Sequence, residues 1–182
     1  NGYIGDDLKS IVELFHPDRN IEFVINSDPA TNGMGDSLKL LSHRISDSFV
    51  VLPNDGIYQH IPDFTHIEGD LVLGSSPINE DESDYTLLSV KSGSSSIVSV
   101  DRNEFNYGRR DNLNSFKSIF TGLMYVKNKE TYFDFMNLCG DKPLEIYSPF
   151  CHYMTSELCV EAITVQWNDI GTYAKYKELL SR

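Results

Sequence analysis

The chain has 182 residues, 40% of them hydrophobic, and its formal net charge is −12 because 27 acidic residues outnumber 15 basic ones. This length suits one domain, residues 1–182, with a sizeable core. The acidic balance argues against nucleic acid or an anionic membrane as the main partner, since both attract clustered Lys and Arg. No apolar run reaches the length of a membrane span, and the first residues do not resemble a signal or transit peptide, so we expect a cytoplasmic protein.

The three cysteines, Cys139, Cys151 and Cys159, contain no C-x-x-C pair. An odd number at these spacings does not make a disulfide framework or a zinc site, so we expect buried, reduced thiols. Coordination of a metal ion by Cys151, His152 and Cys159 is the weaker alternative.

The first quarter of the chain predicts two helices separated by one strand. Asp6 can cap a helix over 6–15, whose apolar residues follow helical spacing, and Pro17 ends it. The β-branched run 21–25 predicts a short strand. A loop containing two glycines then leads to a second helix over 36–45.

Residues 48–56 are the most informative local segment. The apolar run 49–52 fits a strand buried on both faces, and Pro53-Asn54-Asp55-Gly56 follows it directly. Parallel α/β sheets present site residues in this way at the carboxyl ends of their strands, so Asp55 is placed where ligands bind. A simple turn at Asn54-Asp55-Gly56 is the competing interpretation.

The middle of the chain predicts three strands, over 70–74, 85–90 and 97–100. The last two form a hairpin closed by the serine-rich loop 91–96. The acidic segment 79–84 is expected to be a solvated loop. Residues 101–114 hold the densest positive stretch of the chain and either reach an anion or form a surface loop. The basic residues of this stretch are Arg102, Arg109 and Arg110.

The last third predicts strands over 116–126 and 160–165 and helices over 131–139 and 173–180. Gly122 within the first of these strands indicates the close approach of a ligand or a neighbouring backbone. Thr172 is a suitable N-cap for the final helix, which puts Asp169 in the turn just before a helix amino end.

Five segments, in the right order, resemble motifs of the sugar-phosphate nucleotidyltransferases. Trp167-Asn168-Asp169-Ile170-Gly171-Thr172 is similar to the W-x-D-x-G-T signature of that family. The other four are residues 1–8 (N-Y-L-G-D-x-I in the family), 31–38 (G-T-A-x-A-L), 50–55 (a strand ending in G-D) and 120–126 (x-x-G-x-Y-x-F). The resemblance spans nearly the whole chain. It implies an α/β fold, with a Rossmann-like mixed, mostly parallel sheet flanked by helices and a hairpin insertion.

The resemblance implies an enzyme that joins a sugar 1-phosphate to a nucleoside triphosphate. Asp55 and Asp169 match the two family carboxylates that hold Mg²⁺ on the triphosphate, and oxygen ligands suit this hard cation. The sugar phosphate then attacks the α-phosphorus and pyrophosphate leaves. Gly33 matches a backbone contact to the base, and Gly122 matches one to the sugar. Turn or packing geometry is the alternative for both glycines.

Two departures from the family pattern bear on these expectations. Where the family has E-K-P, whose lysine grips the sugar phosphate, this chain has Asp101 and Arg102, which would have to substitute. The N-terminal strand and the G-x-G-x-R loop of the family have no counterpart in the sequence. We therefore expect the C-terminal majority of a catalytic domain, truncated at its N-terminus and inactive alone. There are two alternatives: another chain supplies the missing N-terminal part, or the domain is a degenerate relative that binds ligand without turning it over.

Two other functions compete with this enzyme. The first is a non-catalytic nucleotide or nucleotide-sugar binding module, or a regulatory one, with the same fold. The second is a glycosyltransferase, which would need a D-x-D-type metal motif that the sequence does not offer. The expected partners are a nucleoside triphosphate and a sugar phosphate, without nucleic acid or membrane, and the sequence permits a homo-oligomer.

Overall fold

The structure, a computed structural model, describes residues 5–28, 31–78, 85–102, 105–108, 114–140 and 143–181. The helices in these residues are α1 (Gly5–Phe15), α2 (Met34–Lys39), the 3-10 turn η1 (Phe64–His66), α3 (Lys129–Leu138), α4 (Phe150–Thr155) and α5 (Tyr173–Leu180). The strands are β1 (Phe49–Val51), β2 (Gly56–Tyr58), β3 (Leu71–Ser76), β4 (Leu87–Lys91), β5 (Ile97–Arg102), β6 (Phe105–Gly108), β7 (Ser115–Val126), β8 (Val160–Thr164) and β9 (Trp167–Asp169).

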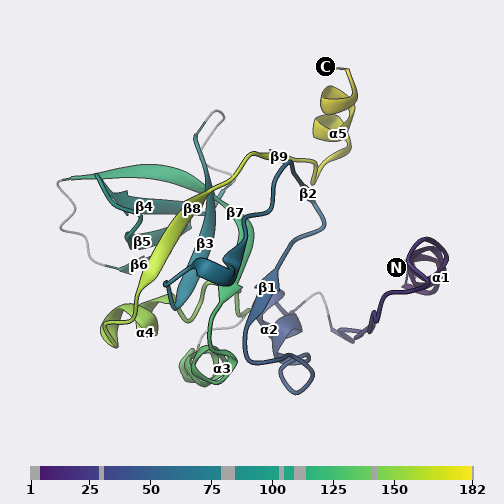
Figure 1. The fold of residues 1–182 in the computed structure, drawn as a ribbon, viewed down its shortest axis with the longest axis horizontal. Coiled ribbons are helices and arrows are strands. Elements are labelled where there is room, and N and C mark those ends of the chain that lie inside the picture. The colour runs from purple at the N-terminus through teal and green to yellow at the C-terminus, as the bar shows by residue number, and fades with distance from the viewer. Residues whose placement is uncertain are drawn as a thin grey trace.

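Strand β7 pairs with β1, β3 and β4 in the main sheet (Figure 1). The strand order of this sheet is β6-β5-β4-β7-β3-β8, and β1 lies off this path. One edge of β7 pairs with β3. The opposite edge pairs first with β4, through residues 115–119, and then with β1, through residues 124–126. Strands β2 and β9 form a separate two-stranded sheet, which in Figure 1 lies next to α5. The gap between the β4 and β1 pairings holds Gly122, and this is the part of the sheet that faces the site described below.

The mixed α/β class is confirmed, but the expectation of a mostly parallel sheet is wrong for the described strands. Only β3 and β8 pair in parallel there, and the other pairs are antiparallel. Strands β4, β5 and β6 follow one another through short connections, which permit hairpin pairing but no crossover. The long connection from β7 through α3 and α4 to β8 leads to the parallel pair.

Helix α3 packs on the sheet through its aromatic side chains, as its apolar spacing predicts. Tyr132, Phe133 and Met136 are buried. Phe49 of β1 stacks on Phe133 with ring centroids 5.9 Å apart and meets Tyr132 edge-on at 5.5 Å. The buried Tyr132 hydroxyl donates to the carbonyl of Ile146 at 2.7 Å. These contacts fix β1 on the core, and with it the segment that leads to Asp55.

Most predicted elements are confirmed with small shifts of their ends, but the helix predicted over 36–45 ends at Lys39, and two further expectations are wrong. Residues 21–25 form no strand, and their apolar side chains are exposed because no described strand pairs with them. The run 49–52 does form β1, but it is not buried on both faces. Val50 is 44% exposed, since β1 is a short strand that pairs only with β7 among the described residues.

Helix α1 lies apart from the sheet in Figure 1, and its apolar residues Ile11, Leu14 and Phe15 are exposed. Within the described ranges, no helix combines the length and the apolar content that crossing a bilayer requires. The acidic segment 79–84, together with Arg109 and Arg110, lies outside the described residues.

The three cysteines are free thiols, and the expectation that they are buried is wrong for Cys159, which is exposed. Cys139 and Cys151 are half-buried. The part of the chain that the structure describes contains no group of three His, Cys, Asp or Glu side chains able to hold a metal ion, so Cys151, His152 and Cys159 do not form one.

Candidate active site

Strands β2 and β9 bring the two predicted carboxylates together. Gly56, next to Asp55, is the register partner of Asp169. The carbonyl oxygen of Asp55 accepts a hydrogen bond of 2.8 Å from the amide of Ile170. Both carboxylates flank Gly171, because the point where a Cβ on this glycine would stand lies 3.1 Å from Asp169 Oδ1 and 3.8 Å from Asp55 Oδ2. Two residues far apart in the sequence thus share one site.

A cavity of about 350 Å³ opens beside the two carboxylates. Its volume lies within the range of small-molecule sites in proteins. Four of the six residues predicted from the sequence line it, namely Asp55, Arg102, Gly122 and Asp169, and the other two, Gly33 and Asp101, do not.

Gly122 shapes the floor of this cavity. Its φ of +83° lies in the left-handed region that glycine adopts without strain. A Cβ at this position would overlap the ring of Pro53. The adjacent carbonyl of Thr121 accepts a hydrogen bond of 2.5 Å from the Tyr58 hydroxyl, which ties β2 to β7. Packing against Pro53 accounts for the glycine at this position. Gly122 also lines the cavity, and its contact with a sugar stays a prediction.

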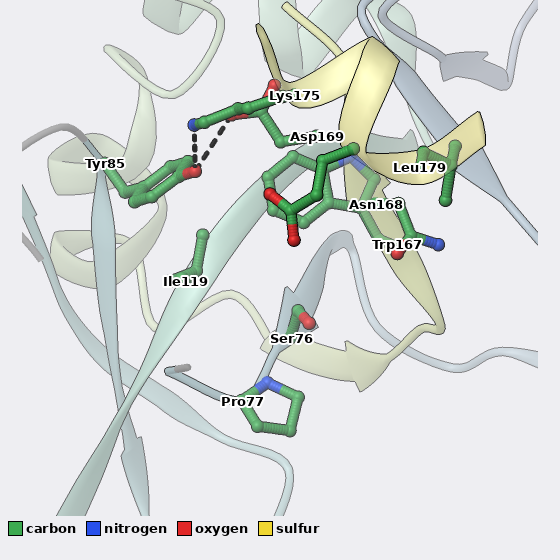
Figure 2. Close-up of a pocket in the computed structure, with 10 residues that line it drawn as sticks. Ser76, Pro77, Tyr85, Ile119, Trp167, Asn168, Asp169, Lys175 and Leu179 are labelled. Atoms are coloured by element: carbon green, nitrogen blue, oxygen red, sulfur yellow. Dashed lines mark hydrogen bonds and ion pairs between the residues drawn. The ribbon is translucent and has the colours of Figure 1, made fainter. Parts of the chain in front are cut away.

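Asp169 is held by three donors, of which Figure 2 draws Tyr85 and Lys175. Its Oδ1 accepts from the amide of Gly171 at 2.7 Å. Its Oδ2 accepts from the Tyr85 hydroxyl at 2.9 Å and forms an ion pair with Lys175 Nζ at 2.5 Å. Lys175 also donates to the Tyr85 hydroxyl at 2.5 Å, and its ammonium lies 4.8 Å from the centroid of the Tyr85 ring. Each of the three groups, the carboxylate, the phenol and the ammonium, therefore contacts the other two.

These contacts shift the pKa values of Asp169 and Lys175. Burial raises the pKa of Asp169, but the hydrogen bonds from Lys175, Gly171 and Tyr85 outweigh burial, so the pKa lies below its ordinary value. The hydrogen bond to Asp169 raises the pKa of Lys175 above its ordinary value. At neutral pH the carboxylate and the ammonium are both ionised.

A second cavity, of about 220 Å³, adjoins the first. The two share the walls formed by Tyr85, Trp167, Asp169 and Lys175. Figure 2 shows the smaller cavity, which is lined by Ser76 at the end of β3, by Pro77 directly after it and by Leu179 of α5. The two cavities therefore meet at the pair formed by Asp169 and Lys175.

Arg102 and Asp101 are neighbours on β5, and their side chains lie on opposite faces of the sheet. The Arg102 guanidinium lies 3.6 Å from Glu145 Oε1, and both residues line the larger cavity. A hydrogen bond with Tyr147 is the main cause that raises the pKa of Arg102, which stays charged. Because side chains alternate along a strand, Asp101 faces the other way, where it accepts a hydrogen bond of 3.2 Å from the Ser99 hydroxyl.

Gly33 is the N-cap of α2 and packs against the segment that follows residue 143. A Cβ at Gly33 would overlap the carbonyl oxygen of Leu144. Asp36 holds the two segments together, since its Oδ2 accepts hydrogen bonds from the amides of Gly33 at 3.0 Å and of Leu144 at 2.8 Å. This packing accounts for the glycine, while the neighbouring Met34 lines the cavity. A contact between Gly33 and a base stays a prediction.

The oxygen donors at this site fit a hard divalent cation. The two carboxylates converge on the space above Gly171 that a side chain would otherwise fill. Asp55 is exposed and the Asp169 side chain is 18% exposed, so both reach the cavity. Mg²⁺ is typically bound by one or two carboxylates, with waters and phosphate oxygens completing the octahedron. The residues present therefore suit magnesium, whose binding stays a prediction.

Sequence reasoning missed Tyr85 and Lys175. For Lys175 a signal existed: Thr172 caps α5, and long side chains in a first helical turn lean back toward the preceding residues, here toward Asp169. For Tyr85 no local signal existed, because it reaches Asp169 across 84 positions of sequence through the pairing of β4 with β7.

No protein-family model and no curated protein sequence matches this chain. Solved structures do match it. The nucleoside-diphosphate-sugar pyrophosphorylase from Vibrio cholerae is 13% identical at a TM-score of 0.72, over 100% of this chain and 78% of that one. The inositol-1-phosphate CTP transferase from T. maritima is 18% identical at a TM-score of 0.65, over 100% of this chain and 73% of that one.

A third structure, HddC from Yersinia pseudotuberculosis, is 16% identical at a TM-score of 0.65, over 96% of this chain and 72% of that one. Together these structures cover the whole sheet and the segments that carry Asp55 and Asp169. The chain therefore has the fold of the sugar-phosphate nucleotidyltransferases.

Proposed function

We propose that this chain is the larger part of the catalytic domain of an enzyme that transfers a nucleotidyl group from a nucleoside triphosphate to a sugar 1-phosphate. The pairing of β2 with β9, which places Asp55 and Asp169 at one cavity, carries the proposal. The fold supports it, because similar structures include a pyrophosphorylase and a CTP transferase, and HddC has a structure complexed with GMP-PN.

In this reaction Asp55 and Asp169 would hold the magnesium ion, which when bound offsets charge on the triphosphate. A phosphate oxygen of the sugar 1-phosphate would form a bond to the α-phosphorus. The bond from that phosphorus to the bridging oxygen of the leaving pyrophosphate would break. Almost all of the contribution of the protein is positioning and charge neutralisation.

Other residues of the cavity would orient the two substrates. Arg102 and Lys175 are the basic side chains among its described lining residues, and they are the candidates for contacts with phosphate oxygens. Gly122 leaves the backbone of β7 uncovered at the cavity floor, where a sugar hydroxyl could hydrogen-bond to it. The proposed cation offsets the acidic character of the site toward anionic substrates.

Pyrophosphate release tests the proposal. The full-length gene product is incubated with a panel of nucleoside triphosphates and sugar 1-phosphates, with and without magnesium. We expect magnesium-dependent release for at least one pair, and a loss of about 100-fold or more in Asp55→Asn and in Asp169→Asn. Asp134→Asn, an exposed carboxylate on α3, is the matched control and should retain full activity.

Two outcomes would contradict the proposal. Activity that survives in both aspartate variants would refute the assignment of the metal ligands. Nucleotide binding in calorimetry without pyrophosphate release for any pair would assign the chain to a non-catalytic binding or regulatory module instead.

A further inference from the structure

Lys175 lies where the two cavities meet, on the carboxylate that a divalent cation would use. Its Nζ is 2.5 Å from Asp169 Oδ2 and also donates to the Tyr85 hydroxyl (Figure 2). Lys175 lines both cavities, so its ammonium borders the space in which a substrate would lie. One side chain thus touches the proposed metal ligand and faces the proposed substrate.

The larger cavity is lined by acidic and basic side chains, and Lys175 is one of the basic ones. The described lining residues of the cavity include three carboxylates, Asp55, Glu145 and Asp169, and two basic groups, Arg102 and Lys175. Arg102 lies 3.6 Å from Glu145, and Lys175 is the counter-ion of Asp169. A divalent cation on the same carboxylate would repel the ammonium, because like charges at such distances interact strongly in a partly buried site.

We propose that Lys175 is an exchangeable counter-ion: it pairs with Asp169 while no divalent cation is bound, and moves to a phosphate oxygen of the substrate when the cation takes the carboxylate. The identity of the anion, a di- or triphosphate group, rests on the proposed function. A lysine suits this exchange, because its ammonium is a compact charge with three donors on a flexible stem.

The surroundings of Lys175 restrict the movement to the side chain. The amide of Lys175 donates to the Thr172 hydroxyl at 3.3 Å, which fixes the first turn of α5. The side chain is 28% exposed, so it has room to turn toward the cavity. The face of the Tyr85 ring, 4.8 Å from Nζ, offers a cation–π contact that keeps the ammonium in the cavity after it leaves Asp169.

Binding of Mn²⁺ alone tests the first half of the exchange. The affinity of the chain for Mn²⁺ is measured at neutral pH from the electron paramagnetic resonance signal of the free ion. We expect Lys175→Met to bind Mn²⁺ roughly 3- to 10-fold more tightly than wild type, because a competitor worth about 1 kcal/mol has been removed. Lys177→Met on the same helix loses the same charge but does not line either cavity, and should match wild type.

Binding of pyrophosphate in the presence of saturating Mn²⁺ tests the second half. We expect Lys175→Met to bind pyrophosphate about 10-fold more weakly than wild type, and Lys175→Arg, which keeps the charge, to recover most of the loss. Circular dichroism establishes that each variant is folded before it is titrated. Lys175→Gln, which also lacks the charge, supplies the Mn²⁺ measurement if the methionine variant does not fold, and should then bind Mn²⁺ more tightly than wild type.

The results separate this inference from the proposed function. If Lys175→Met binds Mn²⁺ equally or more weakly than wild type, Lys175 does not compete with the cation and the inference is overturned, whether or not the full-length enzyme turns over. Unchanged pyrophosphate binding in Lys175→Met overturns it as well. If both shifts are found but no nucleoside triphosphate reacts, the exchange stands and the proposed enzyme activity fails.

Discussion

The carbonyl oxygen of Asp55 accepts a hydrogen bond of 2.8 Å from the amide of Ile170, beside the register pair of Gly56 and Asp169. The backbone of β2 and β9 therefore sets the distance between the two carboxylates. Gly56 is part of this arrangement, because a Cβ there would overlap the indole nitrogen of Trp167. The geometry of the site depends on a glycine beneath the single tryptophan of the chain.

Gly56→Ala should displace Trp167 and disturb both carboxylates. We expect a loss of about 1–3 kcal/mol in the free energy of unfolding, as for other overpacked sites, together with a shift in the fluorescence emission of Trp167. Urea unfolding and emission spectra measure the two effects. Gly140→Ala is the control, since a Cβ there meets nothing within 4 Å. An unchanged emission spectrum in Gly56→Ala would show that Trp167 does not pack on Gly56.

Gly122→Ala should cost more than a positive φ alone explains. Gly93 has a similar φ, +77° against +83°, but a Cβ on Gly93 meets nothing within 4 Å, whereas one on Gly122 would overlap Pro53. We expect Gly93→Ala to lose about 1 kcal/mol of unfolding free energy and Gly122→Ala about 2–4 kcal/mol. Equal losses in urea unfolding of the two variants would argue against the contact with Pro53.

Tyr58→Phe should weaken the link between β2 and β7. The variant loses the hydrogen bond from the hydroxyl to the carbonyl of Thr121, which typically contributes about 1 kcal/mol. Tyr176→Phe, which removes the hydroxyl of an exposed tyrosine, is the control and should be close to wild type.

The same side chain predicts a change at alkaline pH. Burial raises the pKa of Tyr58 to about 12, so the stabilisation is complete below the ordinary value of 10.0 and is lost as the pH rises through the folded value. The difference between the ultraviolet titrations of wild type and Tyr58→Phe should show one phenol that ionises near pH 12. A phenol that ionises near pH 10 in this difference would contradict the burial of Tyr58.

The pair formed by Asp169 and Lys175 predicts a broad plateau of stability. The pKa of Asp169 is lowered, so its contribution is present above the ordinary value of 3.8 and is lost as the pH falls through the folded value. The pKa of Lys175 is raised, so its contribution is present below 10.5 and is lost as the pH rises through the folded value.

Stability measured against pH checks this plateau. Wild type should exceed Lys175→Met by about 1 kcal/mol between these limits, and the difference should shrink in acid. Urea unfolding from pH 3 to pH 9 measures it, with Lys177→Met as the control that matches its charge. A difference that stays constant down to pH 3 would mean that Asp169 does not pair with Lys175.

Local patterns predicted the elements that carry strong periodicity. Helix α3 follows from the spacing of Tyr132, Phe133 and Met136, and α5 follows from the capping residue Thr172. Strands β2 and β9 were not predicted, because their three residues form no apolar run like the one that predicted β1. The strand expected at 21–25 failed for the opposite reason, since a suitable composition makes no strand without a partner that satisfies its backbone hydrogen bonds.

The sequence by itself, through the order of motifs that resembles the sugar-phosphate nucleotidyltransferases, indicated the mixed α/β class and singled out Asp55 and Asp169 as candidate site residues, whose role stays a prediction. Only the tertiary structure decided that Arg102 faces the cavity while Asp101 does not, that Gly33 packs on Leu144, and that Tyr85 and Lys175 hold Asp169. These relationships arise from strand register and from contacts between distant segments. Hydrogen-bond geometry and excluded volume fix them only after the chain has folded.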